Sequence, residues 1–144
     1  MTVKQISIFV ENKIGNLAEV TQVLSKAGVS LHAISLADTK DFGVLRVIVD
    51  DSYLAATTLK EQGYIFSITP VLAIAISDEP GSLYRVLTML EASKVNLEYL
   101  YDFNTRKSDY AYLILKVEQV EEATEVLAKN RIRLLSQEDL KTNN

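Results

Sequence analysis

The chain has 144 residues, a length that fits one ordinary domain or two very small ones. Hydrophobic residues make up 48% and charged residues 24%, the balance of a folded chain rather than a disordered one. The net charge of −4 argues against a nucleic-acid partner, and the absence of cysteine excludes disulfides and thiolate chemistry.

The first half of the chain predicts six elements in the order strand, helix, strand, strand, helix, strand. Residues 3–10 are apolar and β-branched, as strands are. Apolar residues recur at helical spacing from Leu17 to Ala27, and Gly28 stands where a C-terminal cap is expected. The elements expected after it are strands at about 29–37 and 44–49 around a turn in the D-T-K-D stretch from Asp38, a helix at about 52–62 and a strand from about Tyr64.

The second half predicts the same order again. Strands are expected at about 72–77, 96–103, 110–117 and 132–135, with helices at about 82–92 and 120–129. The polar tail from Lys141 is expected to fray.

The two halves are related at the level of single residues. Gly15 and Gly81 lie 66 residues apart, and apolar residues recur at the same offset. The matched pairs are Leu17 with Leu83, Val20 with Val86, Leu24 with Leu90, Val29 with Val95, Leu31 with Leu97, and Ile34 with Leu100. The chain therefore contains one supersecondary unit used twice.

The predicted fold class is α+β, with two tandem ferredoxin-like βαββαβ units and antiparallel sheets packed side by side. We place the domains at 1–69 and 70–144, because Pro70 lacks the N–H that a continuous strand would use. The short junction indicates that the two units pack as one body.

In each half the first strand leads into the first helix through a polar turn with a glycine. The glycine allows backbone angles that other residues avoid, and the helix that follows leaves its first N–H groups without partners. Such N–H groups suit a carboxylate, and Asn12 or Asp78 beside them can accept hydrogen bonds from an ammonium group. The turns thus fit a free amino acid, although an ordinary capped turn explains each one taken alone.

These motifs resemble those of the ACT domain family, small βαββαβ modules that bind amino acids and regulate metabolic enzymes. D-E-P-G-S-L at 78–83 is similar to the family's D-x-P-G-x-L turn, and E-N-K-I-G-N-L at 11–17 to its E-N-x-x-G-x-L variant. A-G-V-S-L at 27–31 and S-K-V-N-L at 93–97 resemble the family's small-G-V-N-I stretch. The resemblance spans nearly the whole chain.

The resemblance implies ligand sites between paired units, each built from the turn of one unit and the second strand of the other. Asn12 would then face the ligand with Asn96, and Asp78 with Ser30. The site with Asn12 and Asn96 keeps the fuller amide set that the family uses, whereas Ser30 replaces the family's Asn at the other site, and Ile14 departs from the usual Pro. We therefore expect two unequal sites, the first tighter. The expected ligand-binding residues are Asn12, Lys13, Ile14, Gly15, Ser30, His32, Asp78, Glu79, Pro80, Gly81 and Asn96.

A histidine, a strand arginine and a group of aromatic residues also bear on this interpretation. His32 could line the pocket, but a half-exposed strand histidine is the simpler interpretation, and a single histidine without cysteine does not predict a metal site. Arg46, a lone charge in an apolar strand, suggests an ion pair. Tyrosines and Phe103 on the strands at 96–103 and 110–117 are reminiscent of RNA-recognition sheets, although packing against a second chain explains such a face better.

No Ser-His-Asp arrangement, P-loop or dinucleotide fingerprint is present, so no catalytic residue and no cofactor are predicted. A small acyl-phosphate hydrolase shares this fold but needs a placed Arg and Asn, whereas the turns offer Lys13 or only acids. The longest apolar run, 71–76, is too short to cross a membrane, and a cytoplasmic location is expected.

The sequence thus predicts an amino-acid-binding regulatory protein that is not an enzyme. Its expected partners are a free amino acid, a second copy in a homodimer, and an amino-acid biosynthetic enzyme, with no nucleic acid and no membrane. The alternative is an RNA-binding or purely structural interaction module on the same fold.

Overall fold

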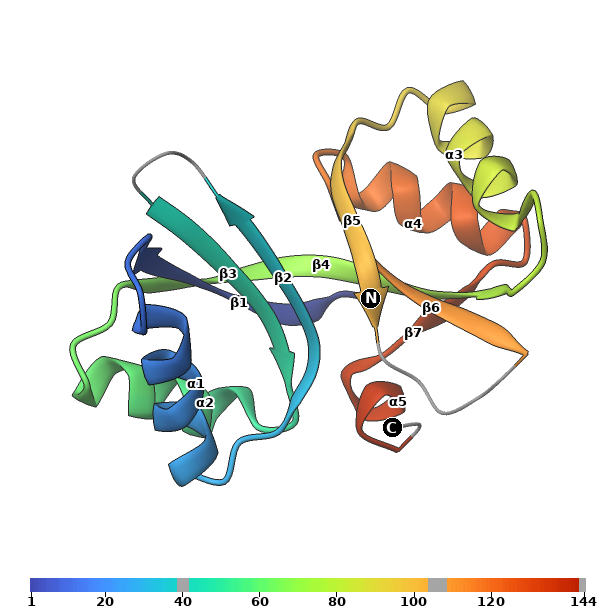
Figure 1. The fold of residues 1–144 in the computed structure, drawn as a ribbon. Coiled ribbons are helices and arrows are strands. Elements are labelled where there is room, and N and C mark those ends of the chain that lie inside the picture. Colours follow the sequence, from blue (N-terminus) through green and yellow to red (C-terminus); the bar gives the residue numbers. More distant parts are fainter. Residues whose placement is uncertain (39–41, 104–108, 143–144) are drawn as a thin grey trace. The chain divides into compact units, whose positions relative to one another are not determined.

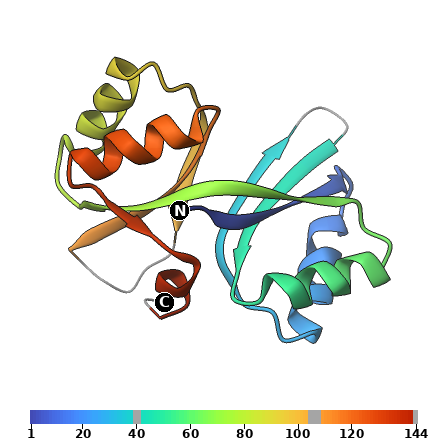
Figure 2. The same cartoon turned by 180° about the vertical axis from the view of Figure 1, so that it is seen from behind.

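The computed structural model describes residues 1–38, 42–103 and 109–142, and the chain forms two compact units (Figures 1 and 2). The first unit is Lys4–Thr69, and the second is Pro70–Asn144 together with Met1–Val3. The turn predicted from Asp38 lies largely outside the described residues.

The first unit has the order βαββαβ, and its last strand is the first part of β4, which continues into the second unit. Its elements are β1 (Val3–Glu11), α1 (Asn16–Lys26), β2 (Leu31–Asp38), β3 (Phe42–Val49), α2 (Ser52–Glu61) and the start of β4 (Phe66–Ser77). The strands lie in the order β2-β3-β1, with β4 next to β1. Both helices cover one face of this sheet (Figure 1), where Ile8, Leu24 and Leu59 form a core that excludes water completely.

The second unit repeats this plan with its own core. Its elements are the rest of β4, α3 (Ser82–Ala92), β5 (Leu97–Phe103), β6 (Tyr110–Val117), α4 (Val120–Lys129), β7 (Arg133–Leu135) and α5 (Gln137–Thr142). The strand order is β7-β4-β6-β5, and every pair is antiparallel. Ile74, Leu90 and Leu127 are among the fully buried side chains of its core. The predicted fold class, two βαββαβ units with antiparallel sheets, is confirmed.

The chain passes from one unit to the next within a single strand. The sequence predicts two strands separated by an interruption at Pro70, and this prediction is wrong, because β4 runs unbroken from Phe66 to Ser77. Pro70 is exposed on that strand. A proline is tolerated in a strand where its missing N–H would not have bonded to a neighbour.

Two residues of the tail, Lys141 and Thr142, are more ordered than the sequence analysis expects, and residues 143–144 lie outside the described residues. Instead of fraying, Lys141 and Thr142 close the short helix α5. Ser136 and Asp139 form a reciprocal capping box: the Ser136 N–H donates to the Asp139 carboxylate at 2.8 Å, and the Asp139 N–H donates to Ser136 Oγ at 3.1 Å. Leu140, at 1% exposure, anchors the helix.

Three of the aromatic residues on the strands of the second unit are buried, whereas Tyr110 is 52% exposed. Tyr101 is 9% exposed, and Phe103 and Tyr112 are each 2% exposed, within the single chain. The rings of Phe103 and Tyr112 lie 6.0 Å apart at a tilted angle. These three side chains cannot stack on bases or cover a second chain without a rearrangement, which corrects the expectation of an open aromatic face.

Candidate functional site

The first turn, Glu11–Leu17, is a tight loop held by its own backbone. The Lys13 N–H donates to the Glu11 carbonyl at 2.8 Å, and the Asn16 side-chain amide donates to the same carbonyl at 3.1 Å. Gly15 then takes the left-handed conformation, with φ 88° and ψ −14°, as the N-cap of α1. Only glycine adopts these angles without strain, so the local fold dictates the residue.

The second turn has the same backbone and different side chains. Gly81 has φ 90° and ψ −11° at the N-cap of α3, nearly identical to Gly15. The Ser82 N–H donates to the Glu79 carbonyl at 3.2 Å. At the equivalent position of the first turn, the Asn16 backbone N–H donates to the Lys13 carbonyl, also at 3.2 Å. The glycine repeat seen in the sequence therefore marks a repeated backbone conformation.

Both helices begin without a side-chain cap. A glycine N-cap has no side chain to accept from the first N–H groups, and none bonds them at α1 or α3. By contrast, Asp51 caps α2 by accepting from the Leu54 N–H at 3.0 Å. The uncapped N-termini of α1 and α3 present partial positive charge, the arrangement that binds carboxylates.

The first turn also borders a small cavity of about 140 Å³. Asn12 and Lys13 line it, together with Leu17 and with Leu36 and Gly43 from β2 and β3. Lys13 forms an exposed ion pair with Glu11 at 2.9 Å, and a hydrogen bond to that carboxylate raises the pKa of Lys13. Ile14 points fully into solvent, at 106% exposure, and does not line the cavity.

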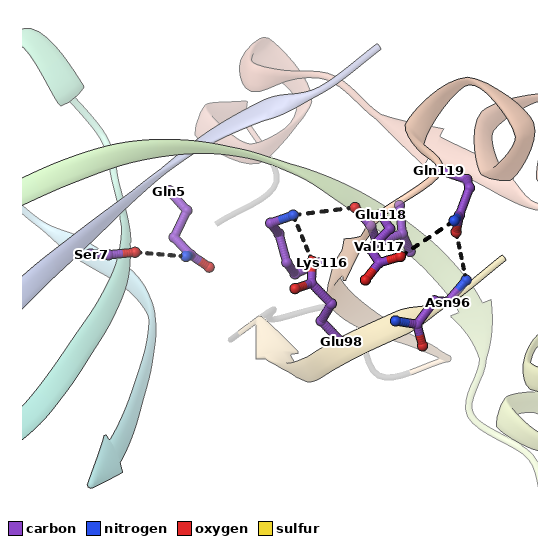
Figure 3. Close-up of polar contacts among 8 residues, drawn as sticks. All are labelled: Gln5, Ser7, Asn96, Glu98, Lys116, Val117, Glu118 and Gln119. Atoms are coloured by element: carbon purple, nitrogen blue, oxygen red, sulfur yellow. Dashed lines mark hydrogen bonds and ion pairs between the residues drawn. The ribbon is translucent and has the colours of Figure 1, made fainter. Parts of the chain in front are cut away.

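Ser30 and Asn96 precede β2 and β5 and are tied to the end of the third strand of their own unit. The Ser30 N–H donates to the Asp50 carboxylate at 2.9 Å. The Asn96 N–H donates to Gln119 Oε1 at 2.7 Å, as Figure 3 shows. In both units the backbone N–H of this residue is hydrogen-bonded, while Ser30 and Asn96 are exposed.

Within each unit, the glycine turn and the start of the second strand lie at opposite ends of the sheet, as the strand pairing shows. At one end of β3, Phe42 pairs with Glu11 beside the first turn, and at the other end Val49 pairs with Leu31 beside Ser30. At about 3.4 Å per residue, these ends lie about 24 Å apart. The same separation holds in the second unit, where β6 pairs Ser77 at one end and Leu97 at the other. One unit alone therefore cannot bring its turn and its Ser30 or Asn96 to the same ligand.

His32 is half-buried in β2, at the bulge between Leu31 and Ala33. Burial lowers its pKa, an effect partly opposed by the negative charge of Asp50. His32 is therefore neutral at physiological pH. Arg46, the lone strand charge, lies in register with Ser7 on β1 and Ser35 on β2.

Two polar features were missed by the sequence analysis. Gln5 is completely buried in β1 and donates to Ser7 Oγ at 3.0 Å (Figure 3). The second feature is a cavity of about 660 Å³ in the second unit, lined by Arg85, Arg131 and Arg133 among others. A weak signal in the sequence was the R-I-R stretch after the predicted helix at 120–129, although only Arg133 of its two arginines lies in a strand, because β7 begins there.

Two βαββαβ units in tandem, each with a glycine turn opening its first helix, define a pair of ferredoxin-like modules of the kind used for regulation. The chain belongs to the ACT domain pair family, whose model matches residues 1–143, and this confirms the resemblance seen in the sequence. The ACT domain pair is a family of regulatory domains.

Solved structures agree with this assignment. Protein BT0572 from Bacteroides thetaiotaomicron is 39% identical, with a TM-score of 0.92 over 98% of this chain and 96% of that chain. The regulatory subunit of aspartate kinase from Thermus thermophilus is 16% identical, with a TM-score of 0.64 over 88% of this chain and 90% of that one. E. coli aspartokinase III, in complex with lysine and aspartate, is 14% identical, with a TM-score of 0.52 over 90% of this chain and 31% of that one. No curated protein matches the chain.

Proposed function

We propose that this chain is a cytoplasmic amino-acid sensor that regulates a partner and performs no catalysis itself. Residues 1–69 and 70–144 are its two ACT domains. The observation that carries the proposal is the repeated left-handed glycine turn, which leaves the N-termini of α1 and α3 without a side-chain cap. The carboxylate of a free amino acid meets those N–H groups.

Each ligand site joins two units, either the two of one chain or those of two chains in a homodimer. Asn12 to Gly15 work with Asn96 at one site, and Asp78 to Gly81 work with Ser30 at the other. The register supports this pairing, because each turn lies about 24 Å from the start of the second strand of its own unit.

The side chains around the two sites differ in what they offer an ammonium group and a ligand side chain. Asn12 and Asn96 provide two amides, each with a carbonyl acceptor and N–H donors, whereas Asp78 and Ser30 provide a carboxylate and a shorter hydroxyl. We expect the amide site to bind more tightly. His32, neutral and half-buried, follows Ser30 on β2 and lines the pocket of the second site.

Binding acts by population shift. An amino acid that needs groups from two units favours the arrangement that completes its site, which strengthens assembly or the complex with a partner. An amino-acid biosynthetic enzyme is the partner class we propose. The similar fold of E. coli aspartokinase III, a structure solved with lysine and aspartate, supports this choice.

A thermal-shift screen of the twenty amino acids, with an RNA oligomer as the competing probe, tests the proposal. One or two amino acids are expected to raise Tm, and Asn12→Ala is expected to reduce that rise. Gln22→Ala, which removes an exposed amide from α1 away from the turn, serves as the matched control. A shift with the RNA oligomer and with no amino acid contradicts the sensor and supports the nucleic-acid alternative.

A further inference from the structure

The two units carry equivalent cavities beside their first helices. The cavity of the first unit, about 180 Å³, is bordered by the end of β1, by α1 and by Tyr64. The cavity of the second, about 660 Å³, is bordered by the end of β4, by α3 and by the connection from α4 to β7. These elements meet at one edge of the second unit in Figure 1. Each of these two cavities is lined by residues of one unit only, and the cavity of the first unit shares Val10 and Glu11 with the small cavity at the first turn.

The charges of the two cavities are opposite. Glu11 and Glu19 line the first, and Tyr64 donates a hydrogen bond to Glu19 at 3.1 Å. At the positions of Glu11 and Glu19, 66 residues later, the second unit has Ser77 and Arg85. Arg131 and Arg133 join them, and among the described residues that line the larger cavity there is no carboxylate. Although the chain has a net charge of −4, three of its five arginines line this one cavity.

The arginine of α3 is held by a line of hydroxyl groups. Ser77 Oγ and Ser82 Oγ lie 2.7 Å apart, and Arg85 Nη2 donates to Ser82 Oγ at 3.2 Å. Ser82 is only 5% exposed, so this line is anchored in the unit. In the part of the chain that the structure describes, neither Arg85 nor Arg131 has a carboxylate within ion-pair distance, and Arg133 reaches Asp139 only at 3.9 Å.

Arg131 reaches the cavity from an unusual backbone conformation. It has φ 60°, in the left-handed region, at the position after α4 where the first unit has Gly63 after α2. Lys94 after α3 shares this feature, so the conformation by itself does not define a site. The second unit thus has side-chain-bearing residues in a strained backbone conformation where the first unit has glycine. At Arg131, the side chain that stands in place of glycine lines the cavity.

We propose that this cavity binds the phosphate group of a small phosphorylated molecule, as a second ligand site separate from the amino-acid sites. Arginine forks bind phosphate oxygens in pairs, and the serine hydroxyls and Tyr110 add donors. Ile76, Met89 and Ile132 provide an apolar wall for the rest of the molecule. The volume of about 660 Å³ exceeds what a bare phosphate fills and lies in the range of small-molecule pockets.

Isothermal titration calorimetry of the full chain with inorganic pyrophosphate tests this proposal, with succinate as the dicarboxylate probe. Pyrophosphate is expected to bind, and Arg85→Gln or Arg131→Gln is expected to weaken it about tenfold or more. Lys60→Gln removes one exposed positive charge from the first unit and is expected to leave the Kd unchanged. Arg131→Gly keeps the fold intact by relaxing the backbone, so a loss of binding in a variant with an unchanged or higher Tm isolates the side chain.

Three outcomes overturn the proposal. The first is an absence of pyrophosphate binding to the unmodified chain. The second is an equal loss of affinity in Lys60→Gln, which indicates a diffuse charge effect. The third is succinate binding as tight as pyrophosphate binding, which contradicts the choice of phosphate. None of these outcomes depends on whether an amino acid binds at the glycine turns.

Discussion

The first and second units share a backbone and differ in the charges placed on it. Gly15 and Gly81 agree within 2° in φ, and each is followed by a helix with no side-chain cap. Four residues into those helices, Glu19 of the first unit stands where Arg85 stands in the second. The duplication has kept what the fold needs, left-handed glycines and buried aliphatic residues, while exposed positions have diverged in charge.

The caps of the second helices differ in the same way. Asp51 accepts from the Leu54 N–H and caps α2, while the neighbouring Asp50 accepts from the Ser30 N–H. In the second unit Gln119 is the N-cap residue, yet its side chain accepts from the Asn96 N–H instead of capping α4. In the first unit, two acidic residues therefore divide two roles: Asp51 caps the helix and Asp50 binds the N–H before β2. In the second unit, Gln119 binds the N–H before β5 and leaves α4 without a side-chain cap.

The largest expected effect is the loss of core packing, which should be similar in both units. Leu24 and Leu90 occupy equivalent positions and are 0% and 1% exposed. Leu24→Ala and Leu90→Ala should each lower the free energy of unfolding by about 2–5 kcal/mol, because each leaves a cavity. Chemical denaturation measures this, with Leu17→Ala at a 38% exposed position as the control. A cost confined to one unit would break the equivalence of the two cores.

The glycine turns should show the next largest effect. Gly15→Ala and Gly81→Ala should each cost about 1–2 kcal/mol of stability, because alanine is strained in the left-handed region. At Gly15 an added Cβ meets nothing within 4 Å, so the cost comes from the backbone alone. Gly15→Asn, which tolerates that region, should cost clearly less in the same denaturation experiment. If alanine is accepted without loss at either glycine, the account of the turns fails.

A smaller effect of opposite sign is expected after α4. Arg131→Gly should stabilise the chain by about 0.5–1 kcal/mol, because relief of the strain at φ 60° exceeds the greater entropy of glycine in the unfolded chain. The reverse exchange in the first unit, Gly63→Arg, should destabilise by a similar amount. Thermal unfolding of the pair measures both, and a stabilising Gly63→Arg contradicts the strain at Arg131.

The smallest effect is a pH dependence of stability from His32. Burial lowers its folded pKa below the ordinary value of 6.5, so the unfolded chain binds the proton more readily. This contribution to stability is fully present above pH 6.5 and is lost as the pH falls through the folded pKa. Tm measured at pH 7.5 and pH 5.5 should therefore differ less in His32→Gln than in the unmodified chain. An equal or larger difference in the variant argues against a buried neutral histidine.

The fold could be predicted from the sequence because its strongest signals are local and repeated. The apolar periodicity of α1 and α3 and the two glycines 66 residues apart define the βαββαβ unit without any long-range information. The continuous strand through Pro70 could not be predicted, because a proline's tolerance depends on which neighbour would have received its N–H. The helix α5 was predictable in principle, since S-Q-E-D at 136–139 has the spacing of a capping box.

The candidate site was accessible to sequence reasoning only in part. The turn residues follow from the motif, and Asn12 and Lys13 do line a cavity, but Ile14 does not. The arginine cavity escaped because Arg85 and Arg131 are far apart in the chain, and only the packing of α3 against the connection after α4 brings them together. The burial of Tyr101 and Tyr112 likewise depends on tertiary packing that strand periodicity does not reveal.

The central claim is that two unequal amino-acid sites are built from the glycine turns. Calorimetric titration with the amino acid that gives the largest thermal shift tests it most directly. The account predicts two affinities, with the tighter one lost in Asn12→Ala and Asn96→Ala and the weaker one in Asp78→Ala and Ser30→Ala. Two equal affinities would contradict the inequality, and binding unchanged by all four substitutions would contradict the site itself.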